Sequence, residues 1–181
     1  VYVFGERSAD NNWNRIFRLK PAVIYKPSRQ FRFSQAFEVL ANYVDYDFDD
    51  INVATKSFVF RKFAMDDSLQ WSMSRNLSLL IDYRLQLEEN GQLNWDDWTE
   101  RVLATRRNNW MHIYLRYAVR EQFAVSPGYS FYIREEWRHK IDPNGVEQPE
   151  KLDPYKSHGP VLRLIFSPHY RLRLVLDANR Y

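Results

Sequence analysis

The chain has 181 residues, of which 45% are hydrophobic, 17% aromatic and 27% charged, with a formal net charge of +3 and no cysteine. This length suits one domain that buries a core without covalent staples, and the high aromatic content excludes a disordered chain. The absence of cysteine excludes disulfides and cysteine-ligated metals, and no apolar run reaches the ~18 residues of a membrane helix. Residues 1–181 are therefore predicted to form a single domain.

The dominant pattern along the chain is an alternation of apolar and polar side chains. From Met111 to Val125 every odd position except Glu121 is apolar or aromatic, and Leu77–Glu88 repeats the pattern. A period of two is typical of a strand with one apolar and one polar face. In chain order the predicted strands are Arg15–Lys26, Gln30–Tyr46, Ser57–Met73, Leu77–Glu88, Trp110–Val125, Tyr129–Lys140, Pro160–Phe166 and Tyr170–Arg180, with Val1–Phe4 as the tail of a ninth.

Short and long connections alternate between these strands. Pro, Gly, Ser and Asn mark tight turns, which are predicted at Lys26–Arg29, Ser74–Asn76, Ser126–Gly128 and Ser167–His169. Longer polar connections are predicted at Asp45–Lys56, Glu88–Asn109 and Ile141–His158. Within the second of these, Asn94–Glu100 has a capping residue and early acids, so one or two helical turns are expected in a surface loop.

The two faces of the predicted sheet differ in chemistry. Aromatic side chains lie on the apolar face beside the short turns, at Tyr25, Phe31, Trp71, Phe123, Tyr129, Phe166 and Tyr170. Aromatic rings that border an aliphatic band are typical of a membrane–water interface. Basic side chains lie on the polar face, at Arg18, Lys20, Arg32, Arg84, Arg116, Arg120, Arg134, Arg138, Arg163, Arg171 and Arg173.

In these features the chain resembles bacterial outer-membrane β-barrels. Such barrels have antiparallel strands of ~10 residues, short turns at one end, longer loops at the other, aromatic girdles and a polar interior. The resemblance covers essentially the whole chain, as a pattern and not as a sequence motif. It implies an all-β antiparallel up-and-down meander of about eight strands, as a transmembrane β-barrel or a fragment of a larger barrel. It also implies the bacterial outer membrane as location, the lipid bilayer as partner, and long loops outside the cell.

Some residues depart from the barrel pattern. Polar side chains fall on the apolar face at Gln35, Asp67, Glu121 and Glu135. An acid near the centre of a bilayer costs on the order of 2 kcal/mol. A β-bulge near Arg61–Lys62 or Asp66–Asp67 would shift the parity and is the preferred explanation. The alternative is that Gln35 and Asp67 contact another envelope protein chain.

The two ends of the chain and one proline also bear on closure. The chain opens with Val1–Phe4 without a Met or a signal-peptide pattern, which indicates a mature product or an excised piece. Tyr181 is out of phase with the apolar positions of the last strand. Both observations favour part of a larger barrel or of a shared sheet, with a closed eight-strand barrel as the alternative. Pro21 lies inside a strand, where it removes one ladder hydrogen bond.

Neither catalysis nor nucleic-acid binding is predicted. The histidines His112, His139, His158 and His169 have no metal-ligand spacing, and neither a Gly-x-Ser-x-Gly elbow nor a phosphate-binding glycine loop occurs. We therefore expect no enzyme, no metal and no cofactor. Alternation places arginines and aromatic rings on opposite faces, so they cannot bind one nucleic-acid strand together.

The excess of basic residues on the polar face has two readings. In a wide barrel these residues would favour anions in the lumen of a pore for small solutes. In a narrow eight-strand barrel they would pair and fill the interior, which leaves a membrane anchor. Two other classes stay open. One is a soluble antiparallel β-barrel that binds a small apolar ligand. The other is a structural or assembly component of an envelope complex.

Overall fold

The chain folds into one antiparallel sheet without helices in the part described by the computed structural model, residues 12–46, 56–94, 99–120, 122–141, 147–169 and 172–179. The strands are β1 (Asn12–Leu19), β2 (Ala22–Tyr25), β3 (Phe31–Tyr46), β4 (Phe58–Ser72), β5 (Leu77–Asn94), β6 (Thr99–Arg120), β7 (Phe123–Ile141), β8 (Glu147–Lys151), β9 (Tyr155–His169) and β10 (Leu172–Asn179). The predicted all-β antiparallel meander is confirmed. Among the described residues, no helix is long and apolar enough to cross a membrane.

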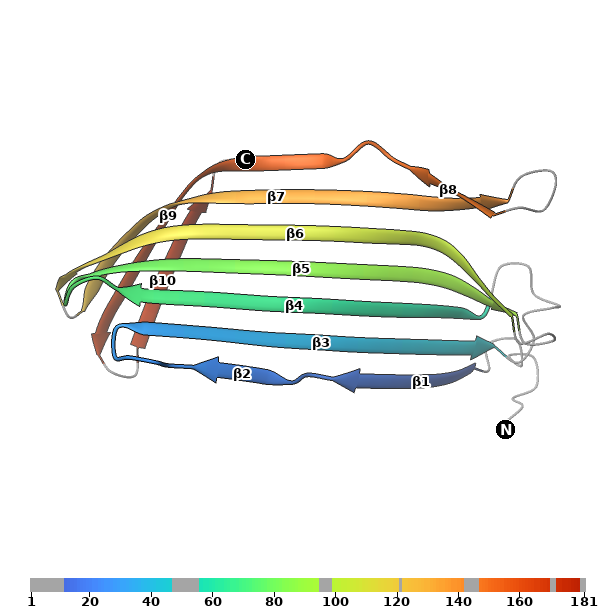
Figure 1. Ribbon diagram of the computed structural model, residues 1–181, viewed down its shortest axis with the longest axis horizontal. Helices are drawn as coiled ribbons and strands as arrows, with labels where there is room; N and C mark the ends of the chain where they lie inside the picture. The colour runs from blue at the N-terminus through green and yellow to red at the C-terminus, as the bar shows by residue number, and fades with distance from the viewer. Residues whose placement is uncertain are drawn as a thin grey trace.

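The strands lie side by side in the order β1-β3-β4-β5-β6-β7-β9-β10, with β2 beside β3 and β8 beside β7 (Figure 1). β1 and β2 follow one another along β3 and are separated by Lys20 and Pro21. Pro21 has no N–H to donate, but its carbonyl accepts a hydrogen bond of 2.9 Å from the N–H of Phe37. The sheet is open, because β1, β2 and β10 have a partner strand on one side alone in the described part.

The predicted long connection Glu88–Asn109 is wrong. β5 continues to Asn94 and β6 begins at Thr99, and the two strands stay paired as far as these residues. The pairing shifts by one residue between Asn90 and Gly91. The predicted helical turns are also wrong at Asn94 and Thr99, which are strand residues. Residues 95–98 lie outside the described part.

The turn predicted at Ser126–Gly128 is wrong, because these residues lie inside β7 and the turn falls at Gln122. A central strand donates N–H groups to both of its neighbouring strands, and proline has no N–H to donate. Around Pro127 the pairing of β7 with β6 is interrupted, whereas its pairing with β9 is continuous. Likewise, β9 includes the predicted turn Ser167–His169. β7 therefore continues past Pro127, although this residue donates no backbone hydrogen bond.

The bulge predicted near Arg61–Lys62 or Asp66–Asp67 is wrong as well. β4 pairs with β3 and with β5 without any shift of register. Gln35 and Asp67 face each other across β3 and β4, and the alternation of β7 leaves Glu135 on the same apolar face. Several predictions fall outside the described residues, namely those for Val1–Phe4, Glu121, Tyr170, Arg171 and Tyr181.

The polar face is the more enclosed side of the sheet, which indicates that the sheet is concave there. Most of the buried apolar side chains lie on it, at Val44, Ala64, Tyr114, Ala124, Val161 and Ile165. Near the short turns, β9 and β10 bend away behind the plane of the other strands (Figure 1). Gly128 on β7 lies between Tyr114 on β6 and Val161 on β9, and the guanidinium of Arg163 on β9 lies 4.6 Å from the centre of the Tyr114 ring.

Candidate functional site: the polar face of the sheet

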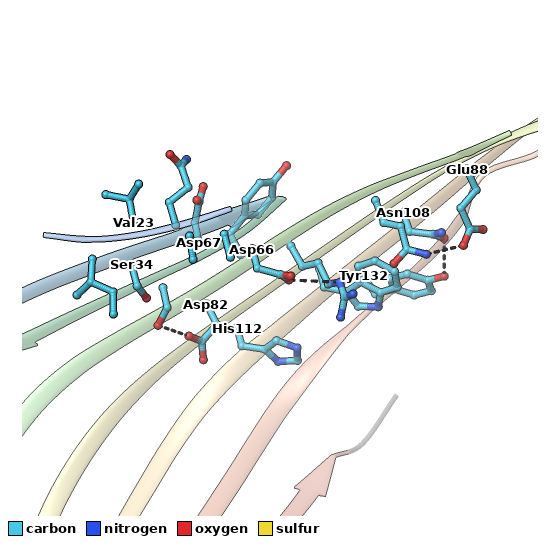
Figure 2. A pocket seen from close by; sticks show the side chains of 18 of the residues that line it. Val23, Ser34, Asp66, Asp67, Asp82, Glu88, Asn108, His112 and Tyr132 are labelled. Atoms are coloured by element: carbon cyan, nitrogen blue, oxygen red, sulfur yellow. Dashed lines mark hydrogen bonds and ion pairs between the residues drawn. The ribbon is translucent and has the colours of Figure 1, made fainter. Parts of the chain in front are cut away.

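A hollow with a volume of about 920 Å³ lies along the polar face of the long strands. The register places side chains of even number from β3 to β6 in it, among them Ser34, Asp82 and His112. Figure 2 shows these three on one side of the strands and Asp67 on the other. The hollow is therefore a groove along the polar face of a two-faced sheet.

Glu38 on β3 is the most enclosed charge of this face. Its side chain is 8% exposed and lies 2.7 Å from Arg18, 3.2 Å from Lys20 and 2.9 Å from Lys62, measured between nitrogen and carboxylate oxygen. The cations come from both flanks, because β1 and β4 are the neighbours of β3. One carboxylate thus holds three strands together by charge.

A second cluster lies nearer to the ends of the strands that are away from the short turns. The carboxylate of Glu136 lies 2.6 Å from Arg134, 3.4 Å from Arg106 and 3.7 Å from Arg138. Arg106 also lies 3.4 Å from Glu88 on the neighbouring strand. Three arginines face two glutamates in this region, so its positive charge is compensated in part.

Between these clusters, acids of the groove have local partners. Arg84 Nε lies 3.3 Å from Asp66, and the hydroxyl of Ser68 donates a hydrogen bond of 2.7 Å to Asp82. The ring of His112 is near them, and its Nδ1 is buried without a hydrogen-bond partner among the described residues. Asp82 and His112 pair in the register of β5 and β6, but no hydrogen bond joins them there.

Aromatic rings close one wall of the groove. Trp110 stacks on Tyr132 with ring centres 5.1 Å apart, and the guanidinium of Arg84 lies 5.9 Å from the Trp110 ring centre. The hydroxyl of Tyr132 donates a hydrogen bond of 3.1 Å to Asn108. This wall is ordered by stacking and hydrogen bonding together.

The predicted basic residues lie where the alternation places them, as far as they are described. The polar face holds Arg18, Arg32, Arg84, Arg116, Arg134, Arg138 and Arg163. Lys20 contacts Glu38, and Arg120 ends β6. Arg171 is outside the described residues, and nothing is described of the side chain of Arg173. Among described residues, Arg32 and Arg116 have no ion-pair partner within 4.0 Å.

Two basic residues of the polar face are not predicted by the sequence. A bulge is expected near Lys62 and a loop around Arg106, yet both residues lie on the polar face of continuous strands. The alternation of side chains could have predicted Arg106, since Arg106, Asn108 and Trp110 continue the even-numbered positions that form the polar face of β6.

The predicted aromatic residues share the apolar face. Phe31 pairs with Trp71, and Phe123 pairs with Phe166 across β7 and β9. Tyr25 is strongly exposed. Tyr129 is not beside a turn as predicted, because it lies within β7, where its hydroxyl is 2.6 Å from His158 Nδ1.

A polar spot interrupts the apolar face. Gln35 pairs in register with Asp67, and Asp67 pairs with Tyr83. The hydroxyl of Tyr83 donates a hydrogen bond of 3.1 Å to Asn109, and Gln35 lies 3.9 Å from the sulfur of Met65. Asp67 Oδ1 is buried without a hydrogen-bond partner in the part of the chain that is described.

The described residues contain no group of three or more histidines and acids that could hold a metal ion. His139 Nε2 lies 3.2 Å from the hydroxyl of Thr105. The groove therefore offers charged groups and hydrogen-bonding groups along its wall.

No protein-family model matches the chain, and no curated protein matches it in sequence.

Proposed function

We propose that the chain forms the wall of a bacterial outer-membrane β-barrel, with its convex apolar face against lipid and its concave polar face toward the interior. The observation that carries this proposal is the exposure of large apolar side chains on the convex face, including Val39, Trp71, Leu87, Leu115, Tyr117, Phe131 and Ile133. Soluble monomers rarely expose contiguous apolar patches above a few hundred Å². A single-layer sheet has no second layer to cover this face.

Strand length supports the same proposal. A tilted strand crosses the hydrocarbon core in about 9–11 residues. β6 has 22 residues and β7 has 19, so we assign the ten or so residues next to the short turns to the membrane. Beyond them the apolar face turns polar, with Arg61 2.8 Å from Glu89 and also paired with Glu100. The partners Glu100 and Tyr43 raise the pKa of Arg61 above its ordinary value.

Single-cysteine labelling tests this assignment cleanly, because the chain has no cysteine of its own. We expect a nitroxide at Leu115→Cys to be reached by oxygen from the lipid. A nitroxide at Arg116→Cys, on the opposite face, should be reached by a water-soluble nickel complex. The measurement is power-saturation electron paramagnetic resonance in liposomes, continued along β6 to reveal a period of two.

A soluble ligand-binding barrel makes the opposite expectation. In that case the Leu115→Cys label would be shielded from both reagents, and the protein would be a monodisperse monomer without detergent. Either result would overturn the assignment to a membrane. The Ser78→Cys label is the matched control, because Ser78 pairs with Arg116 and shares its face.

For the interior we propose a lumen that favours small anions. The basic residues around Glu38 and Glu136 outnumber the acids there, and Arg32 and Arg116, near the short turns, have no ion-pair partner among the described residues. A ring of one charge sign raises the local concentration of counter-ions. An anchor whose interior is filled by ion pairs would carry no current.

Planar-bilayer recording distinguishes pore from anchor. We expect conductance with a reversal potential that indicates anion preference, and a weaker preference in Arg116→Gln. Arg107→Gln removes the same charge from the opposite face of β6 and is expected to leave selectivity unchanged. No conductance, or a preference for cations, would exclude an anion pore.

A second candidate function is a part in an envelope assembly, favoured by the polar spot at Gln35 and Asp67. A photo-crosslinking residue at Gln35 is expected to give an adduct with another protein chain. The same residue at Val39, on the same face of β3, is expected to give lipid adducts. Lipid adducts alone at position 35 would exclude this contact. The readout is mass spectrometry of adducts formed in native membranes.

A further inference from the structure

A second hollow lies on the apolar face, at the ends of β6 to β9 away from the short turns, with a volume of about 660 Å³. Apolar side chains form its part nearest the assigned membrane zone, namely Met111, Phe131 and Ile133. Of its basic side chains, Arg107 and Lys151 lie farther from that zone, and Lys156 is level with Ile133, with which it pairs. The hollow is therefore apolar toward the assigned membrane zone and cationic from the level of Ile133 outward.

The cationic part carries an excess of positive charge. Of the described residues that line the hollow, Glu135 is the one acid. Its carboxylate lies 2.6 Å from Lys151 Nζ and 4.0 Å from Arg107. These partners, Lys151 first, hold the pKa of Glu135 below its ordinary value, so this acid stays ionised near neutral pH. One negative charge faces three positive ones, and Lys156 has no ion-pair partner within 4.0 Å among the described residues.

Lys151 is also held in place by an aromatic ring. Its Nζ lies 5.2 Å from the centre of the Trp137 ring, at a distance typical of a cation–π contact. Tryptophan and lysine with this combination of an apolar body and a polar tip are enriched where a membrane surface meets water. The position of the cluster, just beyond the assigned hydrocarbon zone, is the level of lipid headgroups.

We infer that this hollow binds the phosphate of an anionic lipid headgroup through Lys151 and Lys156, with an acyl chain along Phe131 and Ile133. The inference rests on the proposed function, because it requires the convex face to be in lipid. The charge complementarity is with phosphate, and the adjoining apolar surface selects a lipid over a free ion. Juxtamembrane basic clusters bind anionic lipids through this same electrostatic attraction.

Native mass spectrometry of the full chain in detergent micelles tests the inference. Phosphatidylglycerol is expected to bind more tightly than phosphatidylcholine, by roughly fivefold for each lysine. The Lys151→Gln/Lys156→Gln variant is expected to lose most of this preference. Raising the salt concentration should weaken the preference in the parent chain, because salt screens exposed charges.

The Arg138→Gln/Lys140→Gln variant is the matched control, since it removes the same charge from the other face of the sheet. An equal loss of preference in this control, or no preference in the parent chain, would overturn the inference. Competition by inorganic phosphate at the same concentration as the lipid would show a site for the free ion instead. The Leu115→Cys label separates the two proposals: lipid contact without headgroup preference removes this inference alone.

Discussion

Replacing Gly128 with valine is expected to destroy most of the stability of the sheet. A Cβ at this position would lie 2.3 Å from the carbonyl oxygen of Ile113 and 2.7 Å from the ring of Tyr114. The first of these atoms belongs to the backbone of β6 and cannot move without breaking the pairing of β6 with β7. Overpacking commonly costs 1–3 kcal/mol and occasionally more, so we expect a loss of at least about 3 kcal/mol in the free energy of unfolding.

Urea unfolding in detergent micelles, followed by far-ultraviolet circular dichroism, measures this loss. Ala118→Val is the matched control, because Ala118 on β6 shares the polar face of the sheet with Gly128 on β7 and already has a Cβ. Valine suits a strand, so the control is expected to change stability little. A Gly128→Val chain that unfolds at the same urea concentration as the parent would contradict this account of the β6–β7 contact.

Replacing Glu38 with glutamine is expected to give the second largest effect. The change leaves Arg18, Lys20 and Lys62 close together without their shared carboxylate. Removing one partner of a buried ion pair costs about 3–5 kcal/mol. Arg18 and Lys20 are half exposed and can turn to water, whereas the side chain of Lys62 is 17% exposed. We therefore expect about 3 kcal/mol, at the lower end of that range, most of it from Lys62.

The double variant Glu38→Gln/Lys62→Met identifies the source of this loss. It removes the least exposed cation together with the carboxylate and is expected to recover most of the stability of the parent chain. Glu150→Gln is the surface comparison, because Glu150 pairs with Lys140 where both side chains are more than half exposed. A double variant no more stable than Glu38→Gln would show that the cations do not cause the loss.

The alternation of side chains predicted the sheet and its two faces, but not the ends of the strands. In β6, the residues from Thr99 to Asn109 are predicted as a loop because both faces carry polar side chains there, with Arg106 on one and Arg107 on the other. Where both faces of a strand carry polar side chains, the period of two disappears although the backbone stays paired. The turn predicted at Pro127 is wrong for a different reason. The pairing of β7 is interrupted there on the side of β6 alone, and this does not end the strand.

The sequence predicts the types of residue in the candidate site, but not which basic and acidic side chains pair with one another. The sequence shows many arginines at positions of even number, but pairing depends on which strands are neighbours. Glu136 meets Arg106 from β6 and Arg134 from its own strand. Lys62 and Glu38 meet because β4 lies beside β3 in continuous register. The pairing of these charges depends on the register between neighbouring strands, which cannot be deduced from the amino-acid composition.

The break at Pro21 gives the sheet two unlike borders. Along β1 and β2 the extended backbone is interrupted at Lys20 and Pro21. Proline on an edge strand opposes the addition of a further strand. β10 has no such interruption from Leu174 to Ala178, and its Leu174, Val175 and Leu176 are exposed. The open backbone edge of β10 is therefore better suited to pairing with a further strand than the interrupted edge formed by β1 and β2.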